Sequence, residues 1–234
     1  MTTPAIEDSL TKAEEAVDAG EGLAGTGFWQ AVSMVKRQPE LVDRYADRIA
    51  VIDERAHRDW ALLVLPLAVG TALAVVATLV GLALIWWAYA LDDVPAIVVF
   101  LLGFGVLIAS THSLAHYFVG SILGIGFHYW FVGAIRRPQP GVKLDYATYL
   151  RARAPRRAWM HASGAIVTKT LPFLLIGAAI AADLPVWVVW LLAGFGVATI
   201  ATDVLWSTKA SDWKKFRREM RFSQESVRGI DPSV

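Results

Sequence analysis

Long uncharged runs alternate with charged segments along this chain of 234 residues. The first run, from Ala61 to Leu91, contains no Asp, Glu, Lys or Arg, and about twenty apolar residues are enough for a helix to cross the hydrocarbon of a bilayer. Three further apolar runs follow along the chain. The pattern predicts an all-α multi-pass membrane protein with four transmembrane helices, at about 61–91, 94–119, 161–182 and 185–206.

The second apolar run is longer than one span requires. It extends from Val94 to Ile135, which is too long for one transmembrane helix and too short for two. Four glycines interrupt its second half, at positions 120, 124, 126 and 133. Region 120–160, which ends in a basic loop, therefore needs an arrangement other than a plain transmembrane helix.

The segments that flank the apolar runs are charged. Residues 1–27 are acidic and rich in glycine, and we expect a disordered cytoplasmic tail there. In 28–60, Leu41, Tyr45 and Ile49 repeat at helical spacing between charged residues, which predicts a cytoplasmic amphipathic helix. The last segment, 207–234, is predicted to be a basic amphipathic tail.

The basic residues indicate the topology. Lys and Arg are concentrated near the N-terminus, in the loop 136–157 and in the C-terminal tail, whereas the turns LDDVP and ADLP contain none. Because basic loops stay on the cytoplasmic side, both termini are predicted to lie in the cytoplasm of a protein of the cell membrane.

Composition supports this class and limits the chemistry. The chain is 56% hydrophobic, which is typical of a membrane protein whose partners include lipid. Its formal net charge of +1 argues against a nucleic-acid-binding protein. It contains no cysteine, so a metal ion would have to be held by histidine and carboxylate.

Two histidines lie four residues apart inside the second apolar run. His112 and His116 project on the same side of a helix. His112 lies 17 residues after Pro95, and Asp203 lies 18 residues after Pro185, so both are on the order of 25 Å below the same membrane boundary. Two imidazoles and one carboxylate are a common ligand set for zinc, with a fourth position open. His112, His116 and Asp203 are therefore the predicted metal ligands.

Other arrangements of these residues stay open. Asp203 can instead form an ion pair with Lys169, the basic residue inside the third span, or interact with Lys209 at the membrane interface. Two histidines on different helices, such as His116 and His161, can hold a haem iron in an electron-transfer protein. A membrane scaffold without any ligand is a further alternative.

The stretch HSLAHYFVGSILGIGF, which begins at His112, resembles the HExxH segment of site-2 protease-like intramembrane zinc metalloproteases. HASGAIVTK, residues 161–169, resembles the small-residue motif of that family's next core span, and ATDVLW, around Asp203, resembles the segment with its third ligand. The resemblance implies zinc, and a short membrane-embedded strand or re-entrant segment after the second span. Lys169, Thr168, Gly164, His161 and His128 are further candidates for contact with a substrate or with the metal ligands.

The resemblance fails at the general base. The family requires a Glu beside the first histidine to take a proton from the metal-bound water, and this chain has Ser113 at that position. A serine hydroxyl is a far weaker base at neutral pH. The expected protein is a relative with little or no peptide-bond hydrolysis that binds or regulates the transmembrane segments of other proteins. The alternative is an active metallopeptidase with an unconventional base.

Overall fold

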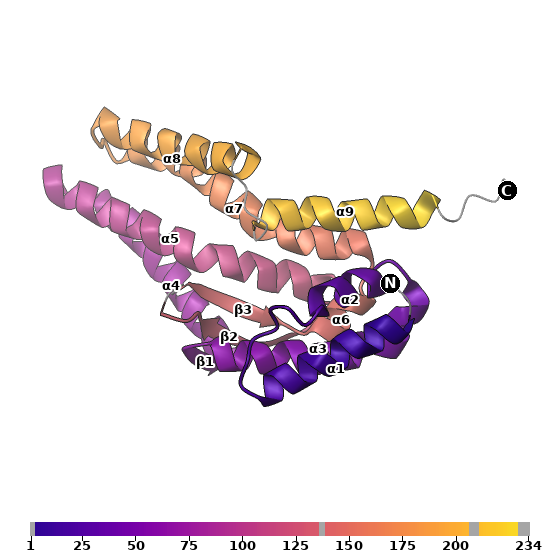
Figure 1. Ribbon diagram of the computed structural model, residues 1–234. Helices are drawn as coiled ribbons and strands as arrows, with labels where there is room; N and C mark the ends of the chain where they lie inside the picture. Colours follow the sequence, from indigo (N-terminus) through magenta and orange to yellow (C-terminus); the bar gives the residue numbers. More distant parts are fainter. Residues whose placement is uncertain (1–2, 136–138, 206–210, 229–234) are drawn as a thin grey trace. The chain divides into compact units, whose positions relative to one another are not determined.

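The computed structural model describes residues 3–135, 139–205 and 211–228 (Figure 1). The described chain is mostly helical and divides into two compact units. The span unit consists of Leu67–Val119 and Ala158–Arg218, and the sheet unit contains the remaining described residues, in Met1–Pro66, Gly120–Arg157 and Glu219–Val234.

Four helices of the structure are long and apolar enough to cross a membrane. They are α4 (Leu67–Ala88), α5 (Asp93–Ile122), α7 (Ala154–Ala181) and α8 (Val186–Leu205). The prediction of a four-span membrane protein is therefore confirmed, although the first helix begins at Leu67 rather than at Ala61. The predicted end of the fourth span, at 206, lies outside the described residues.

One cluster in the interior of the span unit consists of apolar side chains from these helices. Phe100 and Leu107 of α5 and Val188 and Leu192 of α8 are among the buried residues of this cluster. A Cβ added to Gly103 would lie 2.9 Å from the carbonyl oxygen of Gly81. Such close backbone contact through small residues is typical of helices that pack within a membrane, where van der Waals packing drives association.

A small antiparallel sheet forms in the sheet unit. It contains β1 (Leu63–Pro66), β2 (Phe127–Val132) and β3 (Pro140–Leu144), in the order β1-β2-β3. Trp130 of β2 pairs with Leu65 on one side and with Val142 on the other. The strand expected in region 120–160 is present, and β1 explains why the first apolar run is longer than its helix.

The N-terminal region differs from the prediction of a disordered tail over 1–27. Helix α1 (Thr3–Asp18) buries Ile6, Leu10 and Ala13, which repeat at helical spacing among the acidic residues. Two of the acidic residues, Glu7 and Glu14, form ion pairs with Arg48 of helix α3 (Pro39–Trp60). Acidic side chains of α1 are therefore paired with arginines of a neighbouring helix, and the chain is helical over Thr3–Asp18.

The segment 28–60 forms two helices in place of one. These are α2 (Phe28–Val35) and α3 (Pro39–Trp60), and Pro39 occupies the first turn of the second. Short helix α6 (Tyr146–Arg151) follows the sheet, with Asp145 as its N-cap. In the tail predicted over 207–234, the structure has helix α9 (Asp212–Arg228), whereas Lys209 lies outside the described residues.

Glu219 of α9 is a buried carboxylate with three partners in the sheet unit. Glu219 accepts hydrogen bonds from Lys36 at 2.7 Å, from Arg157 at 2.6 Å and from the hydroxyl of Tyr149 at 3.0 Å. Burial would raise the pKa of Glu219, but the two cations outweigh burial and lower this pKa from 4.5 to about 2. Glu219 is thus an ionised anchor between two cations.

Candidate metal centre

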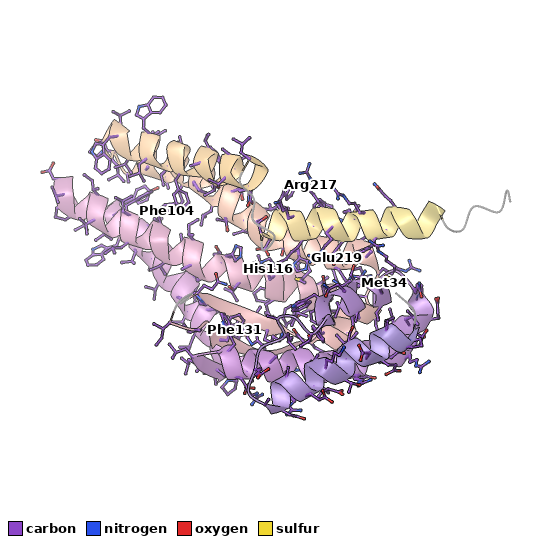
Figure 2. All side chains as sticks on the ribbon, in the orientation of Figure 1. Met34, Phe104, His116, Phe131, Arg217 and Glu219 are labelled. Carbon is purple, nitrogen blue, oxygen red and sulfur yellow. The ribbon has the colours of Figure 1, made fainter. Side chains whose placement is uncertain are left out.

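The predicted histidine pair lies beside a carboxylate in the span unit. His112 and His116 lie one turn apart on α5, and Figure 2 labels His116. Their Nε2 atoms are 3.2 Å apart. The Oδ2 atom of Asp212, in the first turn of α9, lies 3.2 Å from His112 Nε2 and 3.1 Å from His116 Nε2. Three possible ligand atoms therefore meet at one point.

The other nitrogen of each ring has its own partner on α7. His116 Nδ1 lies 2.8 Å from the carbonyl oxygen of Met160. His112 Nδ1 lies 2.8 Å from Thr168 Oγ1 and 3.1 Å from the carbonyl oxygen of Gly164. Thr168 donates its own hydroxyl proton to that carbonyl, so its oxygen accepts from the ring. Both Nδ1 atoms are therefore assigned as proton donors.

This assignment fixes the character of the two Nε2 atoms. A neutral imidazole that has its proton on Nδ1 presents a lone pair at Nε2. Two such lone pairs and a carboxylate oxygen then face one another at 3.1–3.2 Å, which is repulsive unless a cation lies between them. Histidines that ligate metals characteristically donate their second N–H to a carbonyl or another acceptor.

The spacing of the three atoms fits a tetrahedral metal ion. Zinc bonds to nitrogen and oxygen of about 2.0–2.2 Å, at tetrahedral angles, place neighbouring ligand atoms about 3.3 Å apart. The observed separations of 3.1–3.2 Å are close to this value. Within the described residues, His112, His116 and Asp212 form the one group of three with this property.

Asp212 is held in its ionised form. Burial would raise its pKa, but a cation between the rings of His112 and His116, for which a proton is the simplest case, and the ammonium group of Lys215 outweigh burial and hold this pKa well below its usual value. The second carboxylate oxygen of Asp212 lies 3.0 Å from Lys215. This division leaves Oδ2 directed at the histidines and Oδ1 paired with a cation of its own helix.

Gly164 gives the ring of His116 its space. A Cβ at position 164 would lie 2.6 Å from Cε1 of that ring, so any larger residue would displace it. Gly164 and Thr168 are both candidate residues from the sequence, and both lie beside the histidines. Gly164 lets the ring of His116 approach the backbone of α7, and its carbonyl oxygen faces His112. Thr168 orients the ring of His112.

The structure differs from the prediction for the third ligand. Asp203 of α8 accepts a hydrogen bond from Lys169 of α7, which is the alternative that the sequence left open. Equal depth in the membrane does not determine the direction in which a helical side chain points, and Asp203 faces Lys169. Asp212 was missed because it follows the last span in a segment that resembles a basic tail. One sequence feature could have identified Asp212: it is the sole acidic residue between 204 and 218.

Two other predicted histidines occupy separate positions. His161 is buried in the span unit, with its ring centroid 6.5 Å from that of His116. His112 and Asp212 lie within 3.2 Å of His116 Nε2, where a porphyrin ring would have to fit, so the geometry does not favour a haem between His116 and His161. His128 belongs to the sheet unit, where Nε2 lies 3.6 Å from Asp145.

Ser113, at the position of the expected general base, is buried beside His112 on α5. The four spans and the group formed by His112, His116 and Asp212 define the class: an integral membrane protein with a group of side chains that can hold a metal ion. No protein-family model, curated protein or solved structure matches the chain.

Proposed function

We propose that this chain is an integral membrane zinc protein whose ligands are His112, His116 and Asp212. One observation supports the proposal above all others: two imidazole lone pairs and a carboxylate oxygen converge at 3.1–3.2 Å, while both Nδ1 protons are directed at acceptors. A cation relieves the repulsion among these atoms, and a borderline metal suits nitrogen and oxygen donors.

Three protein ligands leave one position of a tetrahedral ion open. This is the pattern of catalytic rather than structural zinc sites, in which the ion polarises a bound water or a substrate carbonyl. The residues of this chain hold and orient such an ion: Thr168 and the carbonyl oxygen of Met160 fix the two rings, and Lys215 pairs with the free oxygen of Asp212.

We further propose a distant relationship to the site-2 protease-like metalloproteases, with peptide-bond hydrolysis weak or absent. The histidine pair and the small-residue segment at Gly164 support the relationship. Ser113 argues against efficient hydrolysis, because loss of a general base lowers the rate by about 10²–10⁴-fold. In this proposal the protein binds or regulates transmembrane segments of other membrane proteins, with both of its own termini in the cytoplasm.

Metal analysis of the detergent-purified protein tests the ligand set. We expect one zinc ion per chain in the wild type and none in His112→Ala, His116→Ala or Asp212→Asn. Asp203→Asn is the matched control, since it removes a carboxylate that faces Lys169, and it should retain the metal. A wild type that takes up no divalent metal would disprove the site, and loss of metal in Asp203→Asn would restore the ligand set predicted from sequence.

A second experiment tests the missing base. Ser113→Glu should raise cleavage of a helix-destabilised transmembrane peptide above the wild-type level, by up to about 10²–10⁴-fold. The double variant Ser113→Glu with His116→Ala is the control and should be inactive. If Ser113→Glu binds metal and leaves cleavage unchanged, the relationship to a protease is not supported, whereas the metal site is unaffected.

A further inference from the structure

Helix α9 presents a basic face that the metal centre does not use. Lys214, Arg217, Arg218 and Arg221 are exposed and are spaced three and four residues apart, so they lie on one side of the helix. Asp212 and Glu219 lie on the opposite side, and Figure 2 shows Arg217 and Glu219 on opposite sides of α9. The helix is thus held by one face and presents positive charge on the other.

Aromatic side chains border the basic face in the span unit. The rings of Trp213 and Phe216 are stacked at 5.0 Å, and Trp159 of α7 contacts Phe216 edge-on at 5.6 Å. Trp213 lies one turn before Arg217. Trp159 is 53% exposed near the start of a membrane-spanning helix, and an exposed tryptophan at such a position is typical of the headgroup level. Contact with Trp159 therefore places the second turn of α9 at this level.

The short connection between α8 and α9 also places the start of α9 near the membrane surface. Asp212 follows Leu205, the last residue of the fourth membrane-spanning helix, by seven positions. Seven residues span at most about 25 Å even when fully extended. The first turn of α9 therefore stays within reach of the membrane surface at which α8 ends.

We propose that the face formed by Lys214, Arg217 and Arg218 binds the anionic headgroup surface of the membrane that the four helices span. Its positive charge complements phosphate groups, and the neighbouring tryptophans suit the boundary between headgroups and acyl chains. The proposal is independent of the metal site, since it depends on the exposed face of α9 and on the membrane-spanning helices alone.

The strength of the interaction follows from its charge. Each basic residue close to an anionic bilayer contributes a factor of roughly five in binding, so three of them contribute roughly 100-fold. Because this attraction acts within a Debye length of about 8 Å at physiological salt, high salt should weaken it.

A single spin label tests the proposal in the full-length protein. The chain contains no cysteine, so Gln224→Cys, two turns beyond Arg217 on the same face, accepts one nitroxide. The protein is reconstituted in nanodiscs of phosphatidylcholine alone or with phosphatidylglycerol, and the access of a water-soluble relaxation agent to the label is measured. We expect phosphatidylglycerol to shield the label, with a roughly 100-fold shift toward the bound state that high salt reverses.

Two variants connect the shielding to this face. Lys214→Gln, Arg217→Gln and Arg218→Gln combined should abolish the dependence on phosphatidylglycerol, whereas Arg217→Lys with Arg218→Lys should retain it. The matched control neutralises three basic residues of α3, Arg44, Arg55 and Arg58, and should retain it as well. The proposal is overturned if the relaxation agent reaches the label equally in both lipids, or if the α3 control loses the shielding. It is also overturned if shielding appears only when RNA is added to phosphatidylcholine discs.

Discussion

Asp212 and Glu219 are carboxylates two turns apart on helix α9, and their surroundings are opposite in character. Glu219, in the sheet unit, is buried between Lys36 and Arg157 and also accepts from Tyr149. Asp212, in the span unit, has one oxygen paired with Lys215, while the other faces two imidazole lone pairs. A structural carboxylate has its counter-charges supplied by the fold, whereas a metal ligand leaves a cation to be supplied from outside.

The ion pair of Lys169 and Asp203 belongs with Glu219 in this comparison. Both carboxylates are compensated by protein cations, so neither needs an external ion. What separates the candidate metal centre from these two groups is the orientation of its imidazole protons, which Thr168 and the carbonyl oxygens of α7 determine. The comparison therefore predicts that changes at the metal centre affect binding, and that changes at Glu219 affect stability.

The largest expected effect follows from filling the space at Gly164. Gly164→Ala would drive a methyl group into the ring of His116, so the two Nε2 atoms can no longer meet. We expect metal content to fall from one ion per chain to none, measured on protein that retains its helical circular dichroism. Gly177→Ala on the same helix is the control, because an added Cβ there meets nothing within 4 Å. Full metal content in Gly164→Ala would show that the ion does not bind between these rings.

Removing the charge of Glu219 tests the other side of the comparison. Glu219→Gln leaves Lys36 and Arg157 buried without a counter-charge, which should cost about 3–5 kcal/mol in the free energy of unfolding. Asp47→Asn breaks the exposed pair with Arg151, which solvent screens, and should lower the free energy of unfolding far less. Denaturant unfolding in detergent measures both. If folded Glu219→Gln protein lost its metal, Glu219 and Asp212 would belong to one functional site.

The same variant predicts a pH dependence. The pKa of Glu219 is about 2 in the folded protein and 4.5 in the unfolded chain, so the unfolded chain binds the proton first as the pH falls. The stability that Glu219 contributes, about 3 kcal/mol from this shift, is complete above pH 4.5 and is lost as the pH falls toward 2. The difference between wild type and Glu219→Gln should therefore shrink over this window. A constant difference down to pH 2 would contradict the ionised anchor.

Much of the fold could be predicted from the sequence, because bilayer thickness sets the length of an apolar run. The four spans and a strand in region 120–160 are examples. Strand β1 was hidden, since its apolar residues continue into α4 without a polar break. Helix α1 was missed because its acidic residues resemble a solvated tail, and their partners on α3 are more than 30 positions away.

The candidate site was predictable only in part, for a geometric reason. His112 and His116 share one helix, so their spacing alone places them together. The third residue comes from another helix, and there depth along the membrane normal favoured Asp203. The direction of a side chain around its helix axis decides such a contact, and it depends on packing that periodicity does not determine. Asp212 also follows the last span, outside the region in which a buried carboxylate was sought.

The smallest effect concerns the group that orients His112. Thr168→Val keeps the shape of the side chain but removes the oxygen that accepts from Nδ1, so the ring is less firmly held with its lone pair toward Asp212. Loss of such a partner typically lowers metal affinity about 10- to 100-fold, which chelator competition would measure. Thr170→Val is the matched control, because Thr170 also bonds back to α7 but is exposed and contacts the carbonyl oxygen of Ile166. Equal affinity in both variants would mean that the carbonyl oxygen of Gly164 alone is sufficient to orient the ring.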